Sequence, residues 1–225
     1  MRWRPCSIGT VAAVLILEPL AELHRDPWLL AIEKPSGLLS QPGRGAHQQD
    51  SVITRLQLQD ADLRLVHRLD RDTSGVLLLA RGLESLRRCS DLFAGRLVRK
   101  LYLADVVGRL LGTGSITAPL ARLQRIPPRY GTHPAGRSAN TRWRSQRLHA
   151  GITRLWLVPM TGRSHQLRAH LAGIGHPIVG DPIYGDVRGS RLHLHAVALS
   201  FRHPFTGMRC RVRSPLHNPF RQDLD

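Results

Sequence analysis

The sequence predicts an α+β fold built on a mostly antiparallel, mixed sheet with flanking helices. Short apolar runs of strand length outnumber the stretches with helical spacing, and the two kinds do not alternate regularly along the chain. At 225 residues, of which 42% are hydrophobic, the chain is long enough to bury a substantial core. With no repeat, low-complexity block or long linker, it is expected to form one domain or one domain with two lobes.

The N-terminal half is expected to contain two strands and two helices. Its second strand is a short and continuously apolar run, which is typical of a strand covered on both faces. Asp50 is expected to cap the first helix. In the second helix, Leu86, Cys89 and Phe93 have helical spacing and Gly95 is the expected stop. In order, these elements are a strand at 28–34, a Pro/Gly-rich loop at 35–45, a helix at 51–59, a strand at 76–80 and a helix at 84–96.

The C-terminal half is expected to add four strands and one helix. Alternation in the first of these strands places Lys100, Tyr102 and Ala104 on one face. A Pro-, Gly- and Arg-rich segment follows it and is expected to be a basic, mobile excursion. In order, these elements are a strand at 100–108, the excursion at 119–140, a strand at 153–159, a turn and helix at 161–175, and strands at 192–201 and 208–213.

The short helix within 161–175 is expected to present two different faces. Leu167, Leu171 and Ile174 mark the face that packs into the core. Arg168 lies about 100° around the helix from Leu167, on a face shared with His165. A long cation at that position can reach across a cleft.

The first 19 residues are expected to be an extension or a first strand. Two arginines followed by an apolar run resemble the start of a signal peptide, but no small-x-small cleavage site follows and the run is too short to span a bilayer. The three cysteines are widely spaced and form no C-x-x-C pair, which argues against a disulfide framework or a zinc ribbon. A cytoplasmic location, without membrane attachment, is therefore expected.

The strongest compositional signal is charge. The 33 basic residues outnumber the 16 acidic ones, which gives a formal net charge of +17. Such a field favours polyanions, of which nucleic acid is the leading candidate. All the basic residues except Lys34 and Lys100 are arginine, which suits phosphate contacts and base stacking, although a GC-rich genome would produce the same bias.

Several other chemistries can be set aside. The "DTSG" at 72–75 has no second carboxylate motif of an aspartic protease, and Ser74 lacks the G-x-S-x-G elbow of an esterase. His165 and His170 are five residues apart, which separates them around a helix, so no metal site is expected. Asp181 and Asp186 in "GDPIYGD" are interpreted as turn formers.

Five motifs together resemble the RluA family of RNA pseudouridine synthases. The blocks "HRLDRDTSGVLLLA" and "TGRSHQLRAHLAGIGHPIVGDPIYG" are long and specific, and the order along the chain is that of the family. The resemblance runs from about residue 20 to about 215, and only residues 119–150 match weakly. The motifs are found at 33–43, 67–80, 100–102, 161–185 and 192–204.

The resemblance implies a fold, an activity and a set of catalytic residues. The fold would be the pseudouridine-synthase catalytic core with a central RNA-binding cleft, formed by residues 20–225 without an S4-like RNA-binding domain. Asp70 falls on the family's catalytic aspartate and Arg168 on its ionic partner. Tyr102 falls on the active-site tyrosine, whose ring stacks on uracil and whose hydroxyl lies where the C5 proton must leave. Arg68 falls on the arginine that fills the space left by the flipped base. The activity would be conversion of uridine to pseudouridine in 23S rRNA and/or a tRNA anticodon stem-loop.

Other residues of the motifs are expected to bind RNA or to shape the catalytic loop. Gly75 would supply backbone freedom, Thr73 local hydrogen bonds, and His67 support for the loop. No cofactor or metal is implied, and the partner would be RNA bound by a monomer. The further RNA-binding side chains are expected to be Lys34, Arg71, Lys100, Arg163 and His165.

Two other classes of protein remain as alternatives. A non-enzymatic basic RNA-binding or ribosome-associated protein would explain the charge but not the paired motifs. A nucleobase glycosylase would also flip a base and use a carboxylate, but it would release the base.

Overall fold

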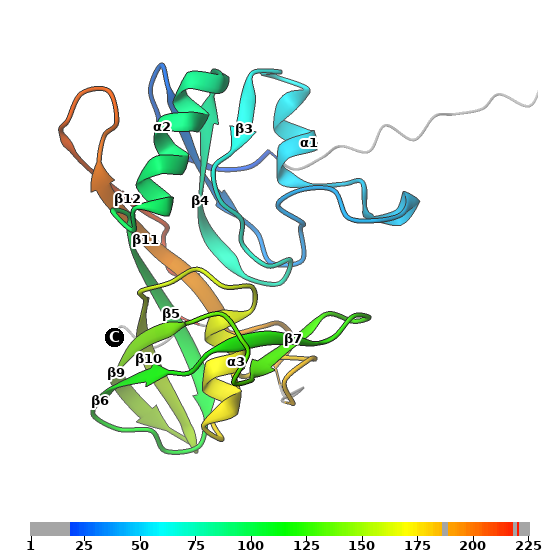
Figure 1. The fold of residues 1–225 in the computed structure, drawn as a ribbon, viewed down its shortest axis with the longest axis vertical. Coiled ribbons are helices and arrows are strands. Elements are labelled where there is room, and N and C mark those ends of the chain that lie inside the picture. Colours follow the sequence, from blue (N-terminus) through cyan, green and yellow to red (C-terminus); the bar gives the residue numbers. More distant parts are fainter. Residues whose placement is uncertain (1–18, 186–188, 218–219, 221–225) are drawn as a thin grey trace, which may run out of the picture.

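The computed structural model describes residues 19–185, 189–217 and 220, so the expectation for residues 1–18 lies outside the described part of the chain. Most of the strands form one ten-stranded sheet that runs the length of the molecule (Figure 1). The strands of this sheet are β1 (Glu22–Arg25), β2 (Leu29–Lys34), β3 (Leu63–Leu65), β4 (Ser74–Arg81), β5 (Arg99–Val107), β6 (Thr113–Thr117), β9 (Asn140–His149), β10 (Ile152–Pro159), β11 (Leu194–Arg202) and β12 (Arg209–Arg213).

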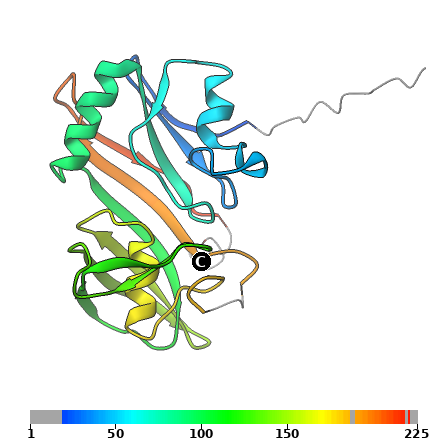
Figure 2. The same ribbon diagram turned by 45° about the vertical axis from the view of Figure 1, so that its right-hand side comes forward.

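The sheet is mixed and mostly antiparallel, as the sequence predicts. Its main path is β1-β2-β4-β11-β5-β10-β9-β6, while β3 pairs with β4 and β12 with β11. Only the β4–β11 pair is parallel among the described strands. This pair joins an N-terminal half, which contains β1 to β4, to a C-terminal half, which contains β5, β6, β9 and β10. Figures 1 and 2 show the two halves as separate lobes connected by long central strands.

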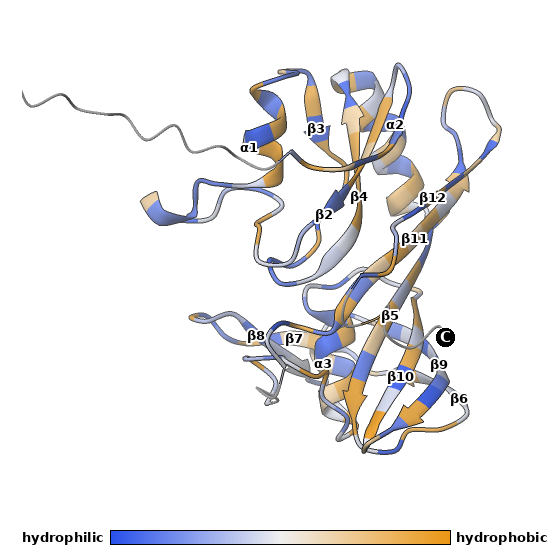
Figure 3. Ribbon diagram, turned by 180° about the vertical axis from the view of Figure 1, so that it is seen from behind, coloured by the Kyte–Doolittle hydropathy of each residue, from blue (hydrophilic) through white to orange (hydrophobic). Residues whose placement is uncertain are grey.

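Strand β4 is the centre of the N-terminal core and is covered on both faces, as predicted. Leu77 and Leu79 pack with the residues of α1 (Val52–Gln57), and Val76 and Leu78 pack on the opposite side with α2 (Gly82–Ala94). Coloured by hydropathy, most of β4 is apolar, whereas α1 and α2 each carry both hydrophobic and hydrophilic residues (Figure 3). A continuous apolar strand is stable only with such double cover.

The helices begin and end close to the predicted residues, with one correction. Ser51, and not Asp50, caps α1: its hydroxyl accepts the Thr54 N–H, and the Thr54 hydroxyl accepts the Ser51 N–H. Asp50 instead binds the Arg55 guanidinium through both carboxylate oxygens. Helix α2 ends at Gly95 as predicted. Within the described ranges, no helix is long and apolar enough to cross a membrane.

The C-terminal half differs from the expectation in two segments. Residues 119–140, expected to be a basic, mobile excursion with no predicted strand, contain a two-stranded hairpin of β7 (Leu120–Gln124) and β8 (Arg129–Thr132). Leu120 is buried, and the Tyr130 ring packs against that of His165, so the hairpin is attached to the core of this half. Strands β6 and β9 were also not predicted from the sequence, because their exposed positions are polar and break the apolar pattern.

Helix α3 (Gln166–Gly173) packs one face of the C-terminal half, with Leu167 and Leu171 in the core as predicted. Ile174 is the C-cap residue and is 40% exposed, so its predicted place in the core is wrong. Arg168 lies off the core face of the helix, as predicted. Its side chain is nevertheless buried, with only 2% exposed. Its burial is explained by the partners described below.

Gly75 lies where β4 packs directly against β11. It has φ +111°, a conformation that side chains rarely adopt, and a Cβ there would overlap the backbone carbonyl of Ala196. The sequence-based expectation that Gly75 supplies backbone freedom is confirmed. The absence of a side chain allows the parallel pairing that joins the two halves.

Replacing Gly75 with Ala should therefore destabilise the protein strongly. We expect a loss of about 2–5 kcal/mol, from the left-handed conformation together with the overlap at Ala196. Gly112→Ala is a matched control, because Gly112 has φ +92° with nothing within 4 Å of the added Cβ. It should cost roughly 1 kcal/mol. Urea unfolding of both variants tests this, and equal losses would show that the approach of β4 to β11 is not critical.

Candidate active site

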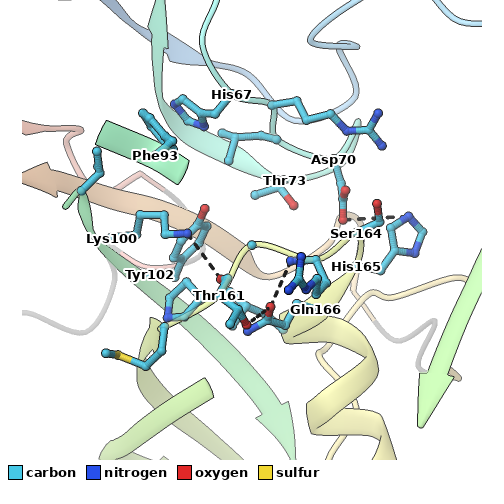
Figure 4. Close-up of a pocket in the computed structure, with 18 of the residues that line it drawn as sticks. His67, Asp70, Thr73, Phe93, Lys100, Tyr102, Thr161, Ser164, His165 and Gln166 are labelled. Atoms are coloured by element: carbon cyan, nitrogen blue, oxygen red, sulfur yellow. Dashed lines mark hydrogen bonds and ion pairs between the residues drawn. The ribbon is translucent and has the colours of Figure 1, made fainter. Parts of the chain in front are cut away.

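A cavity of about 900 Å³ opens between the two halves of the molecule. Its walls come from the segment after β3, the end of α2 with the start of β5, and the segment from the end of β10 to the start of α3. Asp70, Tyr102 and Arg168 all line it, although they are far apart in the sequence. Figure 4 shows Asp70 and Tyr102 projecting into the same space from different elements. The fold therefore brings the predicted catalytic residues together.

The loop that carries Asp70 is held by hydrogen bonds to its main-chain carbonyls. The Ser40 hydroxyl donates to the carbonyl of Leu69 at 2.8 Å and accepts the Leu69 N–H at 3.1 Å. The Ser36 hydroxyl donates to the carbonyl of Asp72 at 2.7 Å. The Thr73 N–H donates to the carbonyl of Asp70 at 3.2 Å. The "KPSGLLS" segment therefore acts as a support for this loop, because its side chains satisfy backbone groups on either side of Asp70.

Lys34 belongs to this support and does not reach the cavity. It is fully buried, and its Nζ donates to the carbonyls of Pro35, Leu38 and Arg71 at 2.7, 2.6 and 2.8 Å. Burial lowers the pKa of Lys34 to about 7, with the charges of Asp72 and Asp70 opposing the shift. Three carbonyl acceptors favour the ammonium form, which alone has three N–H groups. The expectation that Lys34 contacts RNA phosphate is wrong, because all its donors are used inside the protein.

Arg168 binds two carboxylates at once. Its Nη1 lies 3.4 Å from the Asp70 carboxylate, as the predicted ion pair requires. Its two-pronged contact, however, is made with Asp181: Nε and Nη2 donate to the two oxygens of this carboxylate at 2.7 and 2.8 Å. Burial alone disfavours the cation, but the hydrogen bonds and charge of Asp181, with the charge of Asp70, raise the pKa of Arg168 above its usual range. The guanidinium is therefore a permanent cation beside Asp70.

Asp181 is the functional residue that sequence reasoning missed. It was interpreted as a turn former, and it does accept the N–H groups of Ile183 and Tyr184 through Oδ1. It is also fully buried and orients Arg168. The only signal in the sequence was its place in the same motif block as Arg168, since spacing along the chain does not show which of two carboxylates a guanidinium contacts. The predicted pairing of Arg168 with Asp70 is therefore present, but the two-pronged contact of Arg168 is with Asp181.

His165 lies beside Asp70 and has a strained backbone. It precedes α3 with φ 52°, and its Nε2 is 4.0 Å from the Asp70 carboxylate. The Tyr184 hydroxyl accepts the Tyr130 N–H and lies 3.2 Å from Nδ1 of His165. Burial lowers the pKa of His165, and Arg168 adds to this effect, whereas Asp70 opposes it. The hydroxyl can donate to Nδ1 of the neutral ring, which leaves the proton on Nε2, facing Asp70.

Tyr102 extends from β5 into the cavity. It is packed against the apolar clusters of both halves, so it lies at their junction. Burial, with the negative charge of Asp70, raises the pKa of Tyr102 above its usual value. The hydroxyl is therefore protonated at neutral pH, and the ring forms an apolar surface near Asp70 on which a planar base could stack.

The remaining predicted RNA-binding residues divide into two groups. Arg68, Lys100 and Arg163 line the cavity together with His165. Burial lowers the pKa of Lys100, whose Nζ lies 3.4 Å from the Thr161 carbonyl. Arg71 lines a separate, smaller hollow and is paired with Asp72 at 3.0 Å. The fold thus gathers four of the six predicted RNA-binding residues at the cavity and places Lys34 and Arg71 elsewhere.

His67 shapes the wall of the cavity, in line with its predicted supporting role. Its Nε2 accepts the Leu78 N–H at 3.0 Å, and its ring stacks on Phe93 with the ring centres 4.7 Å apart. Burial lowers the pKa of His67 to about 3, with Lys100 adding to the effect. The ring is therefore neutral and accepts this hydrogen bond at physiological pH. Within the described residues, no three His, Cys, Asp or Glu side chains are grouped to hold a metal ion.

Comparison with known proteins agrees with this geometry. A family model described as RNA pseudouridylate synthase matches residues 29–173, which include Asp70, Tyr102 and Arg168. The dual-specificity RNA pseudouridine synthase RluA of Vibrio vulnificus is 40% identical over 199 residues, which cover 83% of this chain and 80% of that protein. The ribosomal large subunit pseudouridine synthase D of Xanthomonas campestris is 36% identical over 220 residues, which cover 88% of this chain and 66% of that protein.

A solved structure supports the same assignment. The human RNA pseudouridylate synthase domain containing 1 has a TM-score of 0.74 and 26% sequence identity with this chain. The similarity covers 95% of this chain and 86% of the human one. With the family model and the bacterial relatives, it shows that the chain belongs to the RNA pseudouridylate synthase family.

Proposed function

We propose that this enzyme converts uridine to pseudouridine in structured RNA, with 23S rRNA and/or a tRNA anticodon stem-loop as substrate. The observation that carries the proposal is the Asp70 carboxylate, 3.4 Å from a buried arginine in a cavity that also contains Tyr102. The uridine is inside a folded RNA, so it must leave its stack to reach Asp70. The cavity is large enough to receive an extruded nucleotide.

The reaction is an isomerisation whose atoms balance without a further reactant. The N1–C1′ bond breaks, the base turns, and a C5–C1′ bond forms, after which C5 loses its proton and N1 carries one. An ionised carboxylate can start this sequence by attack on C1′, by attack on C6, or by removal of the 2′ hydrogen. Asp70 is the proposed carboxylate for each route. The Arg168 guanidinium lies 3.4 Å from this carboxylate.

Tyr102 is proposed to stack on the uracil ring. The sequence-based hypothesis also makes its hydroxyl the acceptor of the C5 proton. The raised pKa of Tyr102 weighs against this second role, because a protonated phenol is a poor base at neutral pH. Stacking needs only the apolar ring, which β5 holds at the junction of the two halves.

The choice of RNA rests on the relatives and on charge. One relative is named as a dual-specificity RNA enzyme and another as an enzyme of the large ribosomal subunit. The net charge of +17 suits either RNA. We further propose that residues 20–225 act as a single catalytic domain, as a monomer and in the cytoplasm, where these RNAs are found.

A purely RNA-binding protein is the alternative from another class. It would need the basic surface but would gain nothing from a buried arginine held between two carboxylates. A buried ion network of this kind is costly to desolvate, and well-packed apolar residues often replace one without loss of stability. The network at Asp70 therefore favours an enzyme over a passive binding protein.

Replacing Asp70 with Asn should abolish turnover and leave RNA binding close to wild type. The expected loss is at least about 10⁴-fold, as for the removal of a central catalytic group. The measurement is tritium release from RNA labelled at C5 of uridine, with RNA affinity measured in parallel. Only a synthase exchanges the C5 hydrogen and retains the base, so this assay also separates a synthase from a glycosylase. Substantial tritium release by the Asn variant would remove Asp70 from the proposed chemistry.

Tyr102→Phe separates stacking from proton transfer. If the ring only stacks, Phe should retain most of the rate. If the hydroxyl accepts the C5 proton, cleavage of the glycosidic bond or adduct formation should continue while tritium release stops. We expect the first result, because the hydroxyl is protonated at neutral pH. Single-turnover measurements that follow both steps decide between them, and an accumulating RNA adduct would contradict our expectation.

Arg168 should have a structural and a catalytic role that two variants separate. Arg168→Met leaves buried Asp181 without its cation, which should cost about 3–5 kcal/mol of stability as well as activity. The double variant Arg168→Met/Asp181→Asn removes both charges but keeps an oxygen to accept the Ile183 and Tyr184 N–H groups. It should regain most of the stability and remain inactive, because Asp70 still lacks its cation. Urea unfolding and tritium release test this, and an active double variant would leave Arg168 with a structural role only.

A further inference from the structure

The cavity extends well beyond the catalytic residues. Its volume of about 900 Å³ is near the upper end of the range for small-molecule pockets, about 300–1,000 Å³, so a single uracil would not fill it. In Figure 4, Phe93 and Lys100 lie on the side opposite Asp70 and His165. Arg96 and Arg99, which neither the motifs nor the reaction accounts for, also line the cavity, and both are close to these two residues in the sequence.

Arg96 has a backbone conformation that favours glycine. Its φ is +57°, and only two other non-glycine residues of the described chain, Ala150 and His165, have positive φ. His165 contacts Asp70, and Ala150 lies in the β9–β10 turn. Gly95 immediately precedes Arg96 but has φ −73°, so the glycine is one position away from the strained site. Arg96 directly follows the C-cap of α2, a position at which a positive φ commonly ends a helix: the Leu97 N–H donates to the carbonyl of Leu92 at 2.9 Å, and the Arg96 N–H to that of Phe93 at 3.2 Å. Glycine is the usual residue there, whereas this chain has an arginine that lines the cavity.

In the part of the chain that the structure describes, the cations at this end of the cavity have no carboxylate partners. Arg96, Arg99 and Lys100 form no ion pair within the described residues. On the preceding helix α2, by contrast, Arg87 and Arg88 are both paired with Glu84. Arg96 and Arg99 are exposed, so water and salt screen their charges, and both guanidinium groups are accessible to an anionic ligand.

We propose that Arg96, Arg99 and Lys100 form a subsite for an RNA phosphate next to the extruded uridine, with Arg96 as the main phosphate contact. The inference rests on the proposed function. Lys100 and Tyr102 are two residues apart in β5, so they lie on the same face of the strand, and both line the cavity. A phosphodiester next to a uridine stacked on Tyr102 would therefore be within reach of this group of cations. The guanidinium of Arg96 suits bidentate contact with a phosphate. The subsite would hold the RNA backbone in register with Asp70.

A pair of glycine variants separates strain from binding. Arg96→Gly and Ala150→Gly both relieve a positive φ, so each should leave the urea midpoint unchanged or higher. Arg96→Gly should in addition weaken the binding of a hairpin RNA with a uridine in its loop, by roughly tenfold. Ala150→Gly should leave binding unchanged. A fall in the urea midpoint of Arg96→Gly with normal RNA affinity would show that Arg96 serves stability, and it would overturn the proposal.

A second experiment identifies the phosphate. In the Asp70→Asn background, which allows binding to be measured without turnover, affinity is compared for hairpins that carry one uncharged methylphosphonate at successive positions. One position next to the target uridine should weaken binding to the Asp70→Asn protein but not to the same protein with Arg96→Gln. The slope of log affinity against log salt concentration should become less steep by roughly 0.7–0.9 for Arg96→Gln. Arg209→Gln removes one charge from β12, outside the cavity lining, and is the control. Each methylphosphonate should change the binding affinity by the same factor with and without this substitution.

The outcomes distinguish the subsite from the function on which it rests. If the wild type releases tritium but no methylphosphonate couples to Arg96, the subsite is wrong and the synthase activity stands. If the wild type releases no tritium from any RNA, the proposed function fails. The coupling measurement would then still show whether Arg96 binds a phosphate, because it does not depend on turnover.

Discussion

The position of one guanidinium organises the active site. Arg168 is only 2% exposed and binds Asp181 with two hydrogen bonds and Asp70 with a third, longer one. Asp70 belongs to the N-terminal half, whereas Arg168 and Asp181 belong to the C-terminal half, so the contact spans the two halves. A buried cation needs this much compensation, because removal from water costs several kcal/mol. Asp181 supplies most of it, which leaves Asp70 close to a fixed positive charge and still 18% exposed to the cavity.

Asp70 is also held from behind, through its backbone. Lys34, Ser36 and Ser40 bind the carbonyls around Asp70 without touching its carboxylate. Arg168 thus acts on the charge of the Asp70 carboxylate, whereas the "KPSGLLS" segment fixes the backbone of the loop. These two constraints come from different halves of the molecule. Such a division suits a reaction that needs one carboxylate at one place, because neither constraint uses the oxygens that must reach the nucleotide.

Local conformational cost is concentrated around the same cavity. Of the three described non-glycine residues with positive φ, His165 and Arg96 line the cavity, and Ala150 lies in a turn. Arg96 also follows the C-cap of α2, where a positive φ commonly ends a helix. Elsewhere glycine meets this need, as at Gly75, where β4 and β11 approach closely. Proteins commonly break local rules at functional sites and compensate through the packing around them. Here the apolar clusters of both halves, which meet at Tyr102, supply that packing.

The sequence by itself determined the α+β class, the buried strand β4, helix α2 with its stop at Gly95, and the loop around Asp70. These features depend on local periodicity, on turn residues and on long motifs, all of which are visible along the chain. Only the tertiary structure decided which carboxylate Arg168 binds most tightly, that Lys34 is buried, and that residues 119–140 contain a hairpin. The reason is physical: the burial and the hydrogen-bond partners of a side chain depend on residues that are distant in the sequence. Asp70 and Arg168, for example, are in contact although they lie 98 positions apart. A charged residue looks the same in the sequence whether its partner is solvent, a carbonyl or a distant carboxylate.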